Sequence, residues 1–307
     1  MLYLITGGAG FIGSNIVKYL LQKGAHVRIL DNFSTGKRDN IREFLSDSHL
    51  ELIEGDLRNY QVVRQAVEDV DYILHQGALP SVPRSISDPV TTNEVNILGT
   101  LHVLEAAKEF KVKRTVYASS SSVYGDTETL PKIETMPIKP LSPYALAKYA
   151  GERYCQIYNQ IYGLETVCLR YFNVFGPKQD PASQYSAVIP KFIKLIREIK
   201  RPVIYGDGHQ SRDFTYVENV VRANILACEA NNVQGQVFNV ACGERTTLLH
   251  LLEAINCILK TDVRPIFEKE RIGDVKHSEA SIEKAKELLH YKVVRRFEEG
   301  LELTIAG

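Results

Sequence analysis

The segment SPYALAKYAGERY places Tyr144 four residues before Lys148. In an α-helix, positions i and i+4 lie on the same face, so the phenol and the ammonium would be neighbours. A phenol has a pKa of about 10 in water, and lowering it to about 7 takes roughly 4 kcal/mol of phenolate stabilisation. A nearby lysine can contribute to this, so the spacing predicts acid–base chemistry. The pattern alone is weak, and two side chains on an ordinary helix face are the alternative.

A second motif, TGGAGFIGSN, has glycines at three-residue intervals, Gly7, Gly10 and Gly13. It follows a β-rich run and precedes a helical pattern that begins near Phe11. Such a turn lets backbone amides approach a pyrophosphate, and the helix N-terminus adds a partial positive charge. Asp31 ends the next predicted strand, where its carboxylate can bind the adenosine ribose and repel a 2′-phosphate. The motif therefore predicts NAD rather than NADP as cofactor.

Two further polar clusters follow predicted strands. Asp56 lies in GDLRN, where it can hold the adenine of the cofactor or simply cap a helix. The run YASSSSVYGD places four serines, 119–122, at the end of a strand, which suits a polar cleft or a loop that satisfies its own backbone. Because the carboxyl ends of parallel strands share one edge of a sheet, this run is expected on the same edge as the glycine loop.

These motifs require a scaffold of alternating strands and helices. β-rich runs occur at residues 2–6, 26–31, 50–55, 71–75, 115–120 and 166–171. Helical patterns lie between them, including FIGSNIVKYLLQKG, which ends at Gly24, NEVNILGTLHVLEAAKEF, and a pattern over 143–162 that begins after Ser142 and Pro143. The order predicts an α/β fold with a doubly wound parallel sheet of the Rossmann type.

After Tyr171 the alternation weakens, and a smaller irregular α/β lobe is expected, suited to closing over a substrate. Its predicted elements are helices near 187–199, 246–259 and 279–289 and a strand at VIYG. The predicted domains are an NAD-binding domain, 1–170 with about 213–240, and a substrate-binding lobe, 171–212 and 241–307.

Composition excludes several classes of partner. Lys plus Arg and Asp plus Glu number 37 each, so neither a nucleic acid nor an anionic membrane is an expected partner. The chain begins without the features of a secretory signal and has no run of 18 apolar residues, so a cytoplasmic protein is expected. The five cysteines lack a C-x-x-C motif and are expected to be reduced, mostly in the core. Histidines and cysteines do not cluster, so no metal site is proposed.

Taken together, the motifs resemble the extended short-chain dehydrogenase/reductase family, and within it the nucleotide-sugar epimerases. The resemblance spans nearly the whole chain and rests on TGGAGFIG, Asp31, SSSSVYG, SPYALAK, RYFNVFGP, SRDFTYV and GDVKHS. It implies that Tyr144 is the acid/base and that Lys148 holds the nicotinamide ribose and lowers the pKa of the phenol. It also implies a serine that binds the sugar hydroxyl. Matching the serine run places it at Ser120, with Ser121 as the alternative.

The resemblance also implies contacts farther from the reacting atoms. Phe172 is expected beside the nicotinamide and Asn173 at the substrate phosphate. Arg212 and Arg271 are expected to bind the diphosphate and Asp274 the uridine ribose, although each arginine could instead form a surface ion pair. The remaining predicted site residues are Phe11, Ile12, Asn32, Asp56, Leu57 and Gln76 for the cofactor, and Ser81, Arg84, Val188 and Tyr205 for the substrate.

The reaction implied by this resemblance is NAD-dependent C4 epimerisation of a UDP-hexose through a transient 4-keto sugar. A 4,6-dehydratase would carry acidic residues in the serine run, which has none before Asp126. A decarboxylase of a nucleotide-uronic acid would need another acid, for which Glu128 and Glu134 remain candidates. The motifs also leave room for a uronic acid epimerase and for a non-catalytic NAD sensor, although a sensor would be expected to lack Tyr144 or Lys148.

Ser278 carries the expectation about the sugar. It ends RIGDVKHS, at a position that resembles a pocket gate where tyrosine restricts some epimerases to UDP-glucose and UDP-galactose. A serine leaves room for a 2-acetamido group, so UDP-N-acetylglucosamine and UDP-N-acetylgalactosamine are the expected substrates, with UDP-glucose and UDP-galactose also accepted. Apolar-faced helices at 93–109 and 143–162 imply a homodimer, as in the epimerases resembled; the alternative is that both faces are buried against the sheet.

Overall fold

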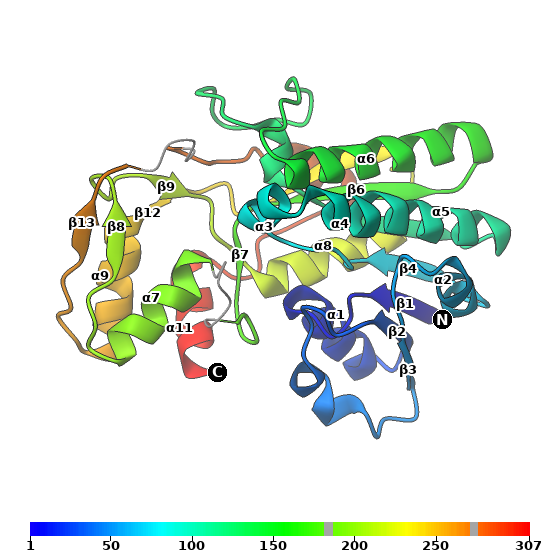
Figure 1. Ribbon diagram of the computed structural model, residues 1–307, viewed down its shortest axis with the longest axis horizontal. Coiled ribbons are helices and arrows are strands. Elements are labelled where there is room, and N and C mark those ends of the chain that lie inside the picture. The colour runs from blue at the N-terminus through cyan, green and yellow to red at the C-terminus, as the bar shows by residue number, and fades with distance from the viewer. Residues whose placement is uncertain (181–186, 271–275) are drawn as a thin grey trace.

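A computed structural model describes residues 1–180, 187–270 and 276–307. Its centre is a seven-stranded sheet with the order β11-β6-β5-β4-β1-β2-β3, in which every neighbouring pair is parallel (Figure 1). The strands are β1 Leu2–Thr6, β2 His26–Asp31, β3 Leu50–Glu54, β4 Tyr72–His75, β5 Arg114–Ser120, β6 Thr166–Tyr171 and β11 Gln236–Val240. The predicted doubly wound parallel sheet is confirmed.

Both faces of the sheet are covered by helices, because successive residues of a strand point to opposite faces. In β1, Leu4 joins the core beneath α2 (Tyr60–Val67), α5 (Gly99–Glu109) and α6 (Pro143–Tyr162). Its neighbour Ile5 joins the core beneath α1 (Phe11–Gln22) and α8 (Val217–Glu229). Strand β6, TVCLRY, is therefore buried along its whole length, its charged residue Arg170 included.

The strand order reverses between β1 and β4, since β2 and β3 extend the sheet in one direction and β5 and β6 in the other. Ligands of such sheets bind beyond the carboxyl ends of the strands at this reversal. The glycine loop follows β1 and the serine run ends β5, so both motifs lie at this edge, as the sequence predicts.

The smaller lobe, at the left of Figure 1, has a core of its own that includes Phe175, Phe192, Ile204, Leu251 and Leu301. Its elements are α7 Val188–Arg197, α9 Leu248–Leu259 and α11 Phe297–Ala306, with three strand pairs: β7 Val174–Phe175 with β10 Thr215–Tyr216, β8 Val203–Tyr205 with β13 Ile266–Glu268, and β9 Ser211–Arg212 with β12 Thr246–Thr247. By contrast, α10 (Glu283–Leu289) packs into the sheet core through Ala285 and Leu289. The predicted domain boundaries stay a prediction.

One predicted helix differs from the structure. The pattern over 93–110 forms α4 (Pro89–Asn93), a π-helical turn (Glu94–Leu98) and then α5. Within this turn, the Asn96 side chain accepts a hydrogen bond from Leu79 N at 2.8 Å and donates to Leu79 O at 3.2 Å. The wider turn brings the amide of Asn96 to the loop after β4, a tertiary requirement that helical periodicity does not record. The remaining short helices are α3 Val82–Ser87 and 3₁₀ turns at Arg38–Asn40, Arg42–Phe44 and Ser121–Tyr124.

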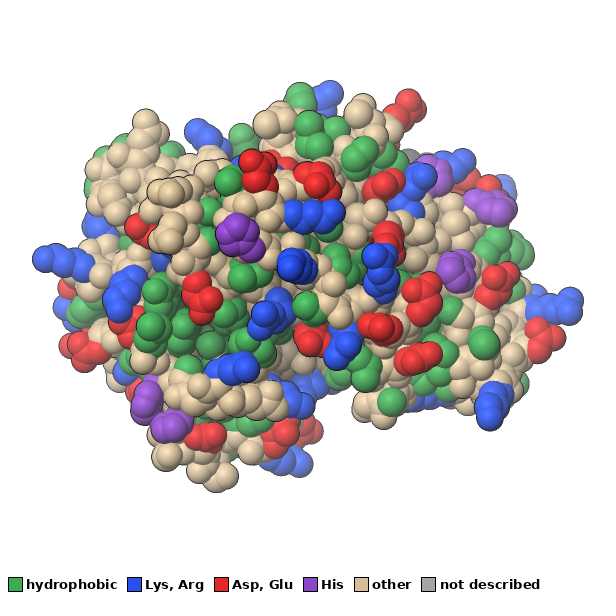
Figure 2. Space-filling view, turned by 180° about the vertical axis from the view of Figure 1, so that it is seen from behind, with side chains coloured by type: hydrophobic (Ala, Val, Ile, Leu, Met, Phe, Trp, Pro, Cys, Tyr) green, Lys and Arg blue, Asp and Glu red, His purple; other side chains and the backbone are tan. Residues whose placement is uncertain are grey.

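The surface and the thiols match the composition. On the face shown in Figure 2, basic and acidic side chains are interspersed without a large area of one sign. The five cysteines are free, and Cys257 alone among them is exposed. Among the residues that the structure describes, no helix has both the length and the apolarity needed to cross a bilayer, and no group of three or more His, Cys, Asp or Glu side chains is placed to hold a metal.

Candidate active site

The helix that carries the tyrosine–lysine pair begins and ends where its local signals predict. The Ser142 hydroxyl accepts a hydrogen bond from Ala145 N at 3.2 Å, Pro143 occupies the first helical position, and Gly163 ends the helix in a left-handed conformation at φ 69°. Tyr144 therefore lies in the first turn of α6, with Lys148 one turn further on. This places both side chains near the carboxyl end of β5, against which α6 packs.

The Ser120 hydroxyl lies close enough to Tyr144 to act on the pKa of the phenol. The Ser120 oxygen already accepts two hydrogen bonds from Ser122, one from its backbone N at 3.2 Å and one from its hydroxyl at 2.9 Å. Its own O–H is not used in either of these bonds. Burial raises the pKa of Tyr144, and the interaction with the Ser120 side chain acts in the opposite direction because it stabilises the phenolate.

Lys148 is a buried cation, only 4% exposed. Its Nζ donates to the carbonyl oxygen of Ala118 at 2.7 Å and lies 5.1 Å from the centroid of the Tyr117 ring. Burial lowers the pKa of Lys148 to about 8, so the ammonium is charged at neutral pH. An ammonium has three donors, and one of them is used by Ala118. Further donors are therefore available for a ribose hydroxyl or a phenolate.

The glycine loop leaves no room for side chains at two of its glycines. Gly7 has φ +68°, and a Cβ there would lie 2.8 Å from the backbone of Gly77. A Cβ at Gly13 would lie 2.2 Å from the carbonyl oxygen of Gly7. Gly10 caps α1 and has no side chain to bond the helix amides, so these amides stay available to an anion. The loop fits the pyrophosphate of a dinucleotide.

Replacing Gly13 with alanine is expected to abolish tight NAD binding, because the new methyl group would force the backbone of the glycine loop apart. Calorimetric titration of the purified protein with NAD measures the loss. Gly24→Ala is the matched control: Gly24 also has a positive φ, +72°, but nothing lies within 4 Å of its Cβ position. Unchanged NAD binding in Gly13→Ala would contradict the placement of the cofactor.

Asp31, the residue predicted to meet the adenosine ribose, ends β2. It is 7% exposed, and its carboxylate accepts hydrogen bonds from Ala9 N at 2.9 Å and Phe33 N at 2.8 Å. Burial raises the pKa of Asp31, and the two backbone hydrogen bonds oppose this rise. An anion fixed here disfavours a second negative charge, so the residues fit NAD better than a 2′-phosphorylated cofactor.

The remaining predicted cofactor residues surround these two motifs. Asn32 donates to Asp56 at 2.8 Å, and Arg58 lowers the pKa of Asp56 to about 2 by hydrogen bonding. The Gln76 side chain donates a hydrogen bond to Asn224 Oδ1 at 3.0 Å and accepts one from the Tyr171 hydroxyl at 3.2 Å. Leu57 is buried against Gly77 and Gly99. Phe172 is also buried, with its ring centroid 6.1 Å from that of Tyr124. Phe11 and Ile12 pack against the core of the smaller lobe.

The predicted substrate residues come from the part of the chain built on the central sheet and from the smaller lobe. Ser278 is buried, and its N–H donates to Ser211 O at 3.0 Å, next to Arg212 in β9. Ser81 caps α3 by accepting from Arg84 N at 3.1 Å, so its hydroxyl has a structural role already. Asn173 donates to Asp213 O at 3.4 Å, Ser121 begins the 3₁₀ turn after β5, Val188 begins α7 and Tyr205 ends β8. Arg271 and Asp274 lie outside the described residues.

Comparison with known proteins identifies the fold family. A model described as "NAD dependent epimerase/dehydratase family" matches residues 3–241. The chain belongs to this family. It is 38% identical over 304 residues to a protein named putative UDP-glucose 4-epimerase from Methanocaldococcus jannaschii, covering 98% of this chain and 96% of that one.

Solved structures of family members agree. A UDP-N-acetylglucosamine 4-epimerase from Methanobrevibacter ruminantium M1, in complex with UDP-N-acetylmuramic acid, is 42% identical with a TM-score of 0.95, covering 99% of this chain and 96% of that one. A UDP-glucuronic acid 4-epimerase from Bacillus cereus, in complex with UDP-glucuronic acid and NAD, is 33% identical with a TM-score of 0.92, covering 100% and 98%. These findings confirm the predictions of an epimerase and of NAD as its cofactor.

Within this family site, sequence reasoning missed three contributors. Ser122 orients the Ser120 hydroxyl, the carbonyl of Ala118 anchors Lys148, and Asn96 holds the loop that follows β4. Ser122 belongs to the serine run, so the sequence indicated a polar residue near the site. It did not indicate that the Ser122 side chain points toward Ser120. A backbone carbonyl has no signal in sequence at all.

Proposed function

We propose that this protein is a UDP-sugar 4-epimerase. The observation that carries the proposal is the meeting of Ser120 and Tyr144, with the buried Lys148 one turn away, at the sheet edge that also bears the glycine loop and Asp31. The family match and the epimerase names of the relatives support it.

The chain's own residues perform the proton transfers. Tyr144, with the Ser120 hydroxyl beside it, accepts the proton of the sugar O4, and the charge of Lys148 stabilises the phenolate that carries out this step. When bound, NAD supplies the acceptor and later the donor of the hydride at C4. After the 4-keto sugar has turned over in the pocket, Tyr144 returns the proton to O4. The substrate undergoes no net oxidation.

The surroundings of the serine run favour epimerisation over the related reactions. Dehydration or decarboxylation would call for another acid near the sugar. Glu128 is exposed, and Glu134 accepts a hydrogen bond from Asn239 N at 2.8 Å, which ties its carboxylate to the end of β11. Asp126 is exposed as well.

N-acetylated UDP-hexoses are the substrates that we propose, with UDP-glucose and UDP-galactose also accepted. Ser278 is a small residue on the segment beside β9, where it leaves room for a 2-acetamido group. The relative from M. ruminantium, named for UDP-N-acetylglucosamine, supports this choice. The relative from B. cereus, which binds UDP-glucuronic acid, favours a uronic acid substrate as the second candidate.

Incubation of the purified protein with UDP-N-acetylglucosamine, UDP-glucose and UDP-glucuronic acid, with and without added NAD, tests the function. NMR of the products reads the configuration at C4. Conversion of UDP-N-acetylglucosamine to its galacto epimer at the highest kcat/KM is expected. Conversion of UDP-glucuronic acid alone would replace the proposed substrate, and no conversion of any of the three sugars would reject the proposed activity on these substrates.

We further propose a homodimer formed through α5 and α6. The inner faces of these helices are buried on the sheet through residues such as Val103, Leu104 and Tyr158. Apolar side chains remain on the outside: in α6, Leu146 is 54%, Ile157 37% and Ile161 65% exposed, and Leu98, which directly precedes α5, is 40% exposed. Exposed apolar patches of this kind mark interaction surfaces. Light scattering should give twice the chain mass of 34.6 kDa, whereas the chain mass itself would reject the dimer.

A further inference from the structure

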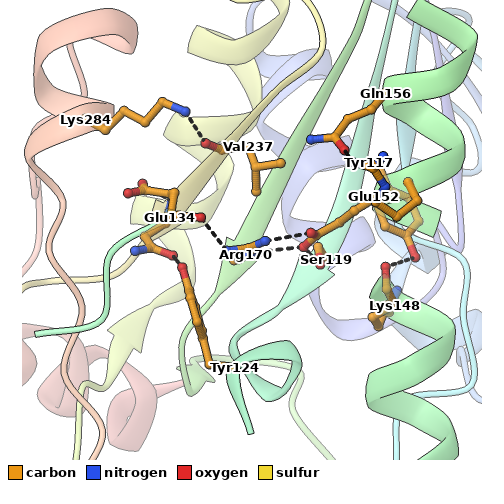
Figure 3. A network of polar contacts seen from close by, with 12 residues as sticks. Tyr117, Ser119, Tyr124, Glu134, Lys148, Glu152, Gln156, Arg170, Val237 and Lys284 are labelled. Atoms are coloured by element: carbon orange, nitrogen blue, oxygen red, sulfur yellow. Dashed lines mark hydrogen bonds and ion pairs between the residues drawn. The ribbon is translucent and has the colours of Figure 1, made fainter. Parts of the chain in front are cut away.

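A buried carboxylate lies one helical turn beyond Lys148 in α6. Glu152 is 1% exposed, and because it follows Lys148 by four residues, both side chains project from the same face of the helix. Its oxygens accept hydrogen bonds from Ser119 Oγ at 2.5 Å and from Arg170 Nε and Nη2, both at 2.8 Å (Figure 3). Ser119, Glu152 and Arg170 together form the cluster that we call the Glu152 cluster.

The Glu152 cluster joins the elements that carry the active site. Ser119 directly precedes Ser120 in β5, and Arg170 lies opposite Ser119 in the β5–β6 register. Lys148 Nζ bonds the carbonyl of Ala118, so α6 is attached to two consecutive residues of β5 immediately before Ser120. The relative position of Ser120 and the tyrosine–lysine pair therefore depends on these two contacts.

The charge of Glu152 also affects the pKa of Lys148. Burial lowers the pKa of Lys148 to about 8, and the negative charge of Glu152 acts in the opposite direction. The other titratable groups around Lys148 are His75 of β4, whose pKa burial lowers to about 3, Tyr117 of β5, whose pKa burial raises well above its usual value, and Tyr144 and Cys155 of α6. Among the described groups that face Lys148, Glu152 is thus the carboxylate.

We propose that Glu152 is a positioning residue of the reaction, which docks α6 against the serine strand and supplies the negative charge that Lys148 faces. It acts through Ser119 and Lys148. Arg170 pairs with both of its oxygens, so a guanidinium compensates the buried carboxylate. The inference rests on the proposed roles of Tyr144 and Lys148.

Two single variants separate the charge from the architecture. Glu152→Gln keeps an oxygen acceptor for Ser119 but removes the charge, so the pKa of Lys148 is expected to fall by about one unit or more. Arg170→Met leaves the carboxylate without its guanidinium, so the pKa of Lys148 is expected to rise. Both variants should melt at lower temperature than the native protein, because each leaves a buried charge unpaired. If Glu152 had a purely structural role, both variants would lose stability, but the pKa of Lys148 would not shift in opposite directions.

The double variant Glu152→Gln/Arg170→Met lacks both charges. We expect it to regain melting temperature relative to the single variants, while the pKa of Lys148 and the basic limb of the kcat–pH profile lie between those of Glu152→Gln and Arg170→Met, because the two charge effects oppose each other. NMR titration of protein labelled at the lysine ε-carbon, with the resonance assigned by its loss in Lys148→Arg, measures the pKa without any substrate. The pKa of Lys148 can therefore be measured even if the epimerase assay shows no activity. Titration of Lys148 as in the native protein in all three variants would overturn the proposal.

Discussion

Replacing Tyr144 with phenylalanine is expected to lower kcat by about 100- to 10,000-fold, the range for loss of a positioned acid or base. The phenyl ring preserves packing at the start of α6, but it has no oxygen to accept the O4 proton or to interact with the Ser120 side chain. NAD binding should be little changed, since the glycine loop and Asp31 are untouched. Steady-state kinetics with UDP-N-acetylglucosamine and calorimetric titration with NAD measure the two quantities.

Tyr162→Phe serves as the matched control for this prediction. Tyr162 is in the last turn of the same helix and 52% exposed, far along α6 from Ser120. It should keep native kcat. A Tyr144→Phe protein that binds NAD and still epimerises at the native rate would remove Tyr144 from the reaction and, with it, the assignment of Ser120 and Lys148 around the phenol.

Replacing Ser278 with tyrosine is expected to reverse the substrate preference. The position is 7% exposed, and its backbone is fixed by the hydrogen bond to Ser211 O, so a tyrosine ring has little free space of its own. At the proposed gate, the ring takes the space of the 2-acetamido group. We expect kcat/KM for UDP-N-acetylglucosamine to fall by at least about 100-fold, the order by which pockets discriminate alkyl-sized groups. Activity on UDP-glucose should be retained. Competition between the two sugars in one reaction, followed by NMR, measures the ratio directly.

Ser278→Ala provides the control, because it keeps the space while removing the hydroxyl. Both sugars should then react nearly as in the native protein. Equal losses on both sugars in Ser278→Tyr would show that the ring disturbs the lobe as a whole, and the gate would have to be sought elsewhere. A native preference in that variant would have the same consequence.

The sequence was informative wherever a local signal sets the backbone. β1, β2 and β6 have their predicted bounds, and α6 runs over 143–162 as predicted, from its serine cap to Gly163. The glycine loop was readable for the same reason, since a positive φ at Gly7 and the close approach at Gly13 admit no side chain. These features depend on neighbours in the chain, so residue type and spacing are enough to predict them.

Contacts between distant segments were not readable. β11 was absent from the predicted strands, and the helix over 93–110 was predicted without its π-helical turn, because in each case the deciding partner lies elsewhere in the fold: β6 for the strand, Leu79 for Asn96. Residue type alone could not show that the Glu152 carboxylate meets Arg170, 18 residues away and on another element.

For this protein, then, the sequence by itself determined the sheet type, the tight turns of the glycine loop and the placement of Tyr144 and Lys148 one turn apart on one helix. The tertiary structure decided which serine lies beside Tyr144, what anchors Lys148, and how the serine strand and α6 are joined. The physical reason is that orientation at the sheet edge results from hydrogen bonds and buried charges between β5, α6 and β6, and these exist only once the strands have paired and the helix has packed.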